Sequence, residues 1–151
     1  MGNNFSPIKV LYGNILKNIL YQHLHGILYS LEVPLMMKTG FGWIEIKGIR
    51  YDHDIIIHTD GSVSKRPKKR SRALKADYGH TPLSDEELDS VRDEHPDAVY
   101  IGTGQYGSLP VTPEALDLLA PYKPVLMKTP DLLSMLEKEK RRYIAVIHVT
   151  C

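Results

Sequence analysis

Apolar and polar residues alternate through GWIEIKGIRYDHDIIIHTDGSVSKR, residues 42–66. A period of two residues is typical of β-strands with one buried face. A glycine follows Lys47 and another follows Asp60, and both dipeptides favour tight turns between antiparallel strands. This stretch therefore predicts an antiparallel meander with turns at Lys47-Gly48 and Asp60-Gly61.

The first helix signal after the meander is a capping box. Ser84 and Glu87 have its spacing, while Leu83 and Leu88 have the spacing of a hydrophobic staple. We therefore expect a helix over about 85–94, which ends before a proline. Two later threonines, Thr112 and Thr129, each precede a proline, the residue preferred in the first position of a helix. They predict helices over about 113–120 and 129–142.

Three short apolar runs separate these helices and end the chain. They are DAVYI, PVLMK and YIAVIHV, and each predicts a strand. In the last run Ile144 and Val146 lie on one face while Ala145, Ile147 and Val149 lie on the other. A strand that is apolar on both faces is covered on both sides, so YIAVIHV is expected in the interior of a sheet.

The first 36 residues differ from the rest. Apolar residues recur there at helical spacing, and MGNNFS fits the pattern for N-myristoylation, so an amphipathic helix or an acylated anchor is one interpretation. The composition changes at PLMMKTGFG, and translation could begin at Met36 or Met37. We favour an extension over residues 1–36 that need not belong to the fold, and a single α/β domain over 37–151.

Composition and charge narrow the classes of partner. The 151 residues carry 19 basic and 18 acidic side chains, so no global field favours nucleic acid or an anionic membrane. No run of 18 uncharged apolar residues is present to span a bilayer. The single cysteine, Cys151, permits no internal disulfide, which favours a cytoplasmic location.

The stretch VYIGTGQYGSLP contains the spacing G-x-G-x-x-G, which is found in dinucleotide-binding folds. In those folds a helix starts within the glycines, but Pro110 would lie inside that helix and break it. The next strand ends in Lys128 and Thr129 instead of the acidic residue that binds a ribose. We therefore expect a tight structural turn and no cofactor.

The same glycine stretch supports a second, weaker hypothesis, a site for a small ligand. If DAVYI and PVLMK are parallel, their carboxyl ends meet at one sheet edge, where α/β folds usually bind ligands. Gly102, Thr103, Gly104, Lys128 and Thr129 would then form an anion pocket at the start of a helix. The alternative is that the glycines only form a tight turn and that Thr129 only caps the helix that follows it.

Other polar clusters are weaker candidates. The basic stretch KRPKKRSR, residues 65–72, lacks aromatic residues to stack bases, so we expect a solvated loop and no nucleic acid binding. Asp52, Asp54 and His58 share one strand face. Three possible ligands on a single strand support a metal site only weakly, so we favour the interpretation that they form a hydrogen-bonded strand edge. His148 and Cys151 would project to opposite faces of a continued strand, which disfavours a thiolate pair.

Several segments together carry a family resemblance: FGWIEIKG, YDHDIIIHTDGSV, VYIGTGQYGSLPVTPEAL, VLMKTPDLL and AVIHVTC. In this order they resemble a small domain of unknown function. That family is shared by archaeal and bacterial single-domain proteins, an adipogenesis-associated cytosolic animal protein and a mitochondrial complex I assembly factor. The resemblance implies a three-layer α/β fold with a central mixed sheet. A Tyr-Asn pair that is frequent in the family's last helix is replaced by Leu136 and Glu137.

The sequence assigns no reaction. It shows no recognisable nucleophile, metal-ligand set or acid-base pair, so no catalytic residue is expected, and the resemblance implies an assembly role. A non-catalytic interaction or assembly module with an unknown protein partner is therefore favoured. An enzyme or small-molecule binder that uses the anion pocket at the Gly102–Gly107 loop remains the alternative.

Overall fold

The computed structural model describes residues 35–151. The predictions of a helix, an acylated anchor or an extension concern residues 1–34, which lie outside the described residues. Strands β1 (Met37–Gly40), β2 (Trp43–Ile46) and β3 (Ile49–Tyr51) form a three-stranded antiparallel sheet. The turn between β2 and β3 is at Lys47 and Gly48, which have φ angles of 50° and 79°. This turn is where the sequence predicted it.

A second sheet has five strands in the order β5-β4-β8-β6-β7. The central strand β8 is antiparallel to β4 and parallel to β6, so the sheet is mixed, and the predicted interior position of YIAVIHV is confirmed. Strand β7 is parallel to β6, as the ligand hypothesis required. The strands are β4 (Ile55–Ile57), β5 (Val63–Lys65), β6 (Ala98–Thr103), β7 (Val125–Met127) and β8 (Tyr143–His148).

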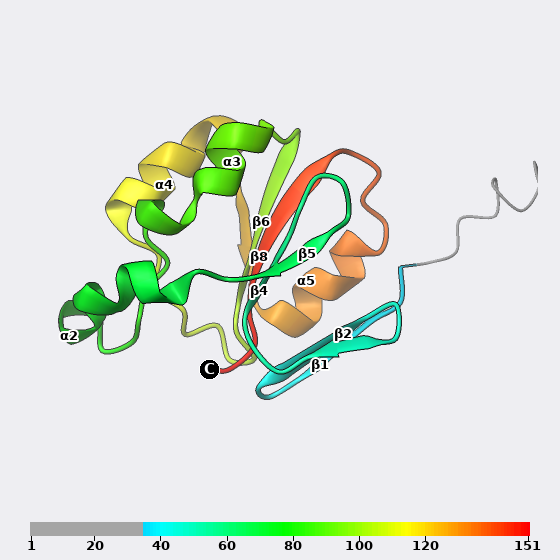
Figure 1. Ribbon diagram of the computed structural model, residues 1–151, viewed down its shortest axis with the longest axis horizontal. Helices are drawn as coiled ribbons and strands as arrows, with labels where there is room; N and C mark the ends of the chain where they lie inside the picture. Colours follow the sequence, from blue (N-terminus) through cyan, green and yellow to red (C-terminus); the bar gives the residue numbers. More distant parts are fainter. Residues whose placement is uncertain (1–34) are drawn as a thin grey trace, which may run out of the picture. The chain divides into compact units, whose positions relative to one another are not determined.

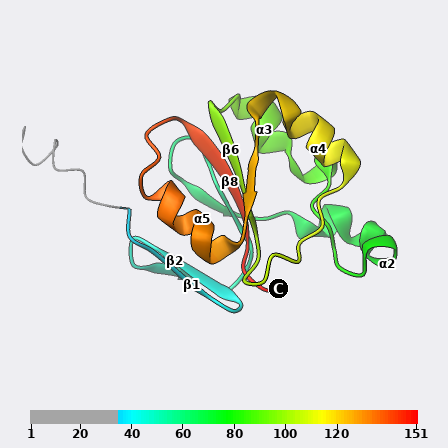
Figure 2. The ribbon, with the colours of Figure 1, turned by 180° about the vertical axis from the view of Figure 1, so that it is seen from behind.

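Helices cover both faces of the five-stranded sheet. Helices α3 (Asp89–Glu94) and α4 (Pro113–Leu119) lie on one side, and α5 (Thr129–Leu136) lies on the other, together with the three-stranded sheet (Figure 1). The view from behind shows the same three layers (Figure 2). A short helix, α2 (Lys75–Tyr78), and the 3-10 helices η1 (Lys68–Leu74), η2 (Asp85–Glu87) and η3 (Ala120–Tyr122) complete the fold.

The two faces of β8 lie in two separate cores, which explains its composition. Ile144 and Val146 pack with the residues of α3 and α4, whereas Ala145 and Ile147 pack with α5 and the small sheet. Because successive side chains of a strand point to opposite faces, a strand with both faces covered must be apolar throughout. The predicted α/β fold with a central mixed sheet is confirmed.

The predicted meander is divided between the two sheets. After β3 the chain bends at Asp52 and His53, and β4 then joins the five-stranded sheet with β5 as its hairpin partner. The bend places Asp54 in the interior, where Arg66 and His148 bind its carboxylate. Because these partners are distant in sequence, the alternating pattern alone did not reveal the division.

The capping box was a wrong prediction. Ser84 makes no capping hydrogen bond, and the predicted helix is broken at Leu88 into η2 and α3. The Ser84 hydroxyl instead lies 2.7 Å from the Ser71 hydroxyl, and Glu87 binds a buried arginine. An unpaired ion in the interior is costly, so the Glu87 carboxylate pairs with the buried arginine and does not bond the backbone N–H that a capping box would give it.

The helix starts at the two threonines differ. Thr112 caps α4 as predicted, since its Oγ1 accepts a hydrogen bond of 3.2 Å from Ala115 N. Thr129 is the first residue of α5 and caps nothing, and this helix ends at Leu136 instead of near residue 142. The Thr129 hydroxyl is used for the site described next.

Candidate functional site

The Gly102–Gly107 loop is joined directly to the start of α5. Gly104 N donates to Thr129 Oγ1 at 3.0 Å, and Thr129 N donates to Gly104 O at 3.0 Å. The Thr129 hydroxyl donates in turn to His148 O at 2.7 Å. One buried threonine side chain therefore connects the glycine loop to the last strand.

The glycines are required because other groups approach them closely. A Cβ atom on Gly102 would lie 2.8 Å from Thr129 Oγ1, and one on Gly104 would lie 2.4 Å from the main-chain carbon of Cys151. Gly104 also has a φ of 100°, which disfavours any side chain. The motif that resembles a dinucleotide fingerprint thus lets two segments of backbone pack together.

The amides of this loop bind the end of the chain. Gln105 N donates to Thr150 O at 2.7 Å, and Ser108 N and Tyr106 N donate to Cys151 O at 2.9 and 3.2 Å. The main-chain oxygen of Cys151 is therefore bound by the amides of Tyr106 and Ser108.

The structure brings the five predicted pocket residues to one sheet edge. Thr103 is buried and accepts a hydrogen bond from Leu109 N through its carbonyl, while Lys128 is exposed with its side chain near Gly107. The first amide of α5, Thr129 N, is already bonded, and Pro130 has no N–H. These contacts describe a structural junction, and anion binding stays a prediction.

A buried cluster of charges lies beside this junction. Arg66 is 2% exposed, and its Nε and a terminal nitrogen bind Glu87 at 2.6 and 2.8 Å. Its other terminal nitrogen binds Asp54 Oδ2 at 3.0 Å. The expectation of a solvated basic loop was therefore wrong for Arg66, because two carboxylates compensate its charge in the interior.

Asp54 also binds the last strand. His148 Nδ1 lies 2.8 Å from Asp54 Oδ2, and Val149 N donates to Oδ1 at 3.0 Å. Burial opposes ionisation of this carboxyl, but these hydrogen bonds and the Arg66 charge outweigh it and lower the pKa of Asp54 to about 2. On its other side, His148 Nε2 lies 3.0 Å from Thr150 Oγ1. Asp54, just before β4, is thus an anion that joins Arg66, between β5 and η1, to the end of β8.

The remaining predicted ligands do not meet. Asp52 pairs with Arg50 at the surface, and His58 belongs to a different cluster. Cys151 Sγ lies 4.0 Å from His80 Nδ1. Among residues 35–151 no group of three or more metal-ligating side chains is assembled. No helix in the same range has the length and apolar character to cross a membrane.

A second cluster was missed by sequence reasoning. His58 Nδ1 lies 2.6 Å from Glu94 Oε1, and His58 Nε2 lies 2.7 Å from Ser64 Oγ. Thr59 donates to the other oxygen of Glu94 through its N–H, at 2.9 Å, and its hydroxyl, at 2.8 Å. Burial raises the pKa of Glu94, but the bonds from Thr59 and His58 outweigh this and lower it overall. The carboxyl of Glu94 is therefore an oriented anion.

Two aromatic side chains are exposed at the edge of the junction. Phe41, in the turn between β1 and β2, is 61% exposed, and Tyr106, in the glycine loop, is 69% exposed. Their ring centroids are 6.4 Å apart. The backbone beneath them is fixed, because Gly42 N donates to Val149 O at 2.7 Å and Gln105 Nε2 donates to Thr39 Oγ1 at 3.0 Å. We call Phe41 and Tyr106 the aromatic surface.

The fold and this junction define a small three-layer α/β domain in which the amides of the glycine loop bind Thr150 and Cys151. No family model and no curated protein matches the sequence. Among solved structures, conserved hypothetical protein PH1505 from Pyrococcus horikoshii OT3 is 34% identical with a TM-score of 0.68, and the match covers 78% of this chain and 100% of that one. MT938 is 30% identical with a TM-score of 0.63, over 78% of this chain and 99% of that one.

The chain belongs to the family of these two proteins. A more distant protein of Bordetella pertussis, described as an Mth938-like domain, is 20% identical with a TM-score of 0.45 over 78% of this chain and 87% of that one. PH1505 is described only as a conserved hypothetical protein. These two relatives show the family and the fold, and their descriptions name no activity.

Proposed function

We propose that this chain is an interaction or assembly module in the cytoplasm, and that it contacts a partner protein through the aromatic surface. The observation that carries this proposal is the exposure of Phe41 and Tyr106 side by side on a fixed backbone. Exposed aromatic residues on a rigid base bind partners well, because they bury large areas and lose little conformational entropy. The resemblance to an adipogenesis-associated protein and a complex I assembly factor supports the same role.

The expected partner is a folded protein with an apolar pocket and a polar rim. Arg50 lies over the ring of Trp43 at 4.6 Å from its centroid and pairs with Asp52 at 2.8 Å, so the same small sheet carries an exposed charge pair. A pocket that accepts the two rings and carries charged or polar groups at its edge would match this arrangement. No chemical step is required of this surface.

Site-specific photo-crosslinking in cells tests the proposal. A benzophenone amino acid at Tyr106 should give a discrete crosslinked species that is lost when Phe41→Ser is added. The same group at Leu116, which is 41% exposed on α4, is the matched control and should not give that species. Equal crosslinks from both positions would count against the proposal, and a crosslinked dimer would identify a second copy as the occupant.

The alternative, an anion-binding pocket at the Gly102–Gly107 loop, is favoured by one observation. Lys128 is exposed, and its stem lies near Gly107. If an anion binds there, phosphate or sulfate should raise the melting temperature beyond the effect of matched sodium chloride, because the ion binds only the folded chain. Lys128→Ala should reduce this gain, whereas an equal response in both proteins would assign Lys128 to the ordinary surface.

A further inference from the structure

Ser64, His58 and Glu94 are arranged as a nucleophile, a base and an orienting carboxylate. Each comes from a different part of the fold: β5, the end of β4 and the end of α3. The two contacts of His58, 2.6 Å to Glu94 and 2.7 Å to Ser64, use its two ring nitrogens. This order of contacts is how proteins activate a hydroxyl for covalent catalysis.

The tautomer of His58 follows from its neighbours. Glu94 is an anion and can only accept, so His58 Nδ1 carries the proton and donates it to Oε1. In the neutral imidazole Nε2 is then the acceptor, and it lies 2.7 Å from the Ser64 hydroxyl that can donate to it. Thr59 fixes the second oxygen of Glu94, so the carboxylate cannot turn away from the ring. Glu94 is a positioning residue in this arrangement.

We propose that Ser64, His58 and Glu94 form a serine nucleophile site that accepts small carboxylic esters. Ser64 is exposed on the edge strand β5, so an ester can reach its hydroxyl. An open pocket of about 270 Å³ is lined by His58, Thr59, Asp60, Ser62 and Glu94, and Ser64 is connected to it through the 2.7 Å contact with the His58 ring. This size favours a small acyl group over a long chain or a peptide.

The reaction balances with water as its second substrate. Ser64 Oγ bonds to the ester carbonyl carbon as His58 Nε2 takes the hydroxyl proton, and the carbonyl π electrons move to oxygen. Collapse breaks the bond to the alkoxy group, which leaves as the alcohol with the proton from Nε2. Water repeats the sequence on the acyl-serine, releases the acid and restores the Ser64 hydroxyl.

The pocket lacks an obvious oxyanion hole among the described residues. Four N–H groups at the pocket are already bonded: those of His58, Thr59, Gly61 and Ser62 donate to Ser62 O, Glu94 Oε2, His58 O and Asp60 Oδ1, respectively. Oxyanion donors contribute roughly 100-fold to 1000-fold each to the rate of acyl transfer. Acylation and hydrolysis are therefore both expected to be slow, so an activated ester is needed to acylate Ser64.

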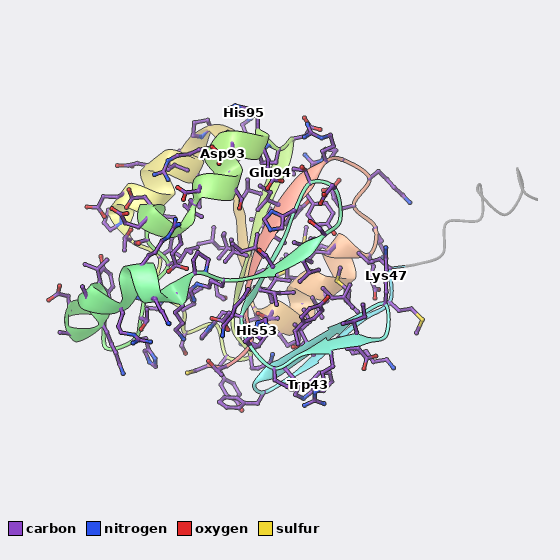
Figure 3. The ribbon with its side chains drawn as sticks, viewed as in Figure 1. Trp43, Lys47, His53, Asp93, Glu94 and His95 are labelled. Atoms are coloured by element: carbon purple, nitrogen blue, oxygen red, sulfur yellow. The ribbon has the colours of Figure 1, made fainter. Side chains whose placement is uncertain are left out.

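This site is separate from the aromatic surface. In Figure 3 Glu94 lies at the end of the molecule opposite Trp43, whose strand leads from the turn that holds Phe41. The ester activity and the partner contact can consequently be tested and lost independently. The variant Phe41→Ser should leave the reaction of Ser64 unchanged.

The test uses the full chain with p-nitrophenyl acetate as ester and a fluorophosphonate as serine-directed probe. Mass spectrometry should place both adducts on Ser64, and Ser64→Ala should abolish them without altering the melting temperature. Ser134→Ala, at an exposed serine of α5, is the matched control and should change nothing. His58→Gln should slow acylation of Ser64 by about 100-fold or more. Glu94→Gln should lower kcat with little change in KM, an effect that a purely structural role would not produce.

Three outcomes would overturn the proposal. They are an absence of any adduct on Ser64, adducts confined to lysines or to other serines, and a Ser64 adduct that forms at the same rate in folded His58→Gln. If His58→Gln does not fold, the comparison of Ser64→Ala with Ser134→Ala still decides the result, because both serines are exposed.

Discussion

At the scale of single residues, the structure depends on positions where backbone segments approach closely. Gly104 is the tightest of these, because its missing side chain leaves room for Cys151 and for the ring of His148. Thr129 is its counterpart, since one hydroxyl serves both Gly104 and His148. A substitution at either position should affect the loop and the last strand together.

Gly104→Ala should destabilise the protein by about 2–3 kcal/mol, from its positive φ and from the contact with Cys151. Gly79→Ala is the matched control, because Gly79 has a φ of 73° and open space around it. It should lose only about 1 kcal/mol. Urea denaturation of both variants measures the difference, and equal losses would show that Cys151 can move aside.

The pKa of Asp54 predicts a dependence of stability on pH. Its ordinary value of 3.8 applies to the unfolded chain, and the folded protein lowers it to about 2. As pH falls, the unfolded chain takes up this proton first, so the free energy of unfolding should decrease between about pH 4 and pH 2, by on the order of 2 kcal/mol. A plot of the free energy of unfolding against pH, taken from denaturation curves, should be flatter for Asp54→Asn over this range. A slope equal to that of the wild type would contradict the assignment.

At the scale of elements, local patterns predicted the structure where the deciding contacts are local. The cap of α4 depends on Thr112 and Ala115, three positions apart, and it is present. The box at Ser84 has the same local pattern but failed, because Glu87 binds Arg66. His58 and Glu94 are 36 positions apart, and no pattern in a single sequence pairs residues over that separation.

The central strand gives the sharpest prediction at this scale. Val146 is 1% exposed and packs in the core beside α3 and α4. Val146→Asp would bury an unpaired charge and should abolish cooperative unfolding. Leu126→Asp is the control, because Leu126 lies on the edge strand β7 and is 40% exposed. Calorimetry should show a transition for the control only, and a stable Val146→Asp would refute the packing described here.

At the scale of the whole molecule, the glycine loop serves the fold. Its amides hold Thr150 and Cys151, so a pyrophosphate would have to displace the end of the chain. NAD, NADP and FAD should therefore show no saturable binding at micromolar concentrations. Isothermal titration measures this directly, and one-to-one micromolar binding would mean that the last residues can leave the loop.

The position of β8 also has a consequence for how the chain folds. Ile55 in β4 pairs with Ile147 in β8, 92 positions further along the chain. A two-stranded hairpin such as β4–β5 is only marginally stable alone, so the large sheet cannot be completed before its late central strand arrives. Pairings over such separations slow folding, and they leave apolar strand edges open in the meantime. Substitutions that hinder the arrival of β8 should consequently lower the yield of folded protein through aggregation, even where the final stability is little changed.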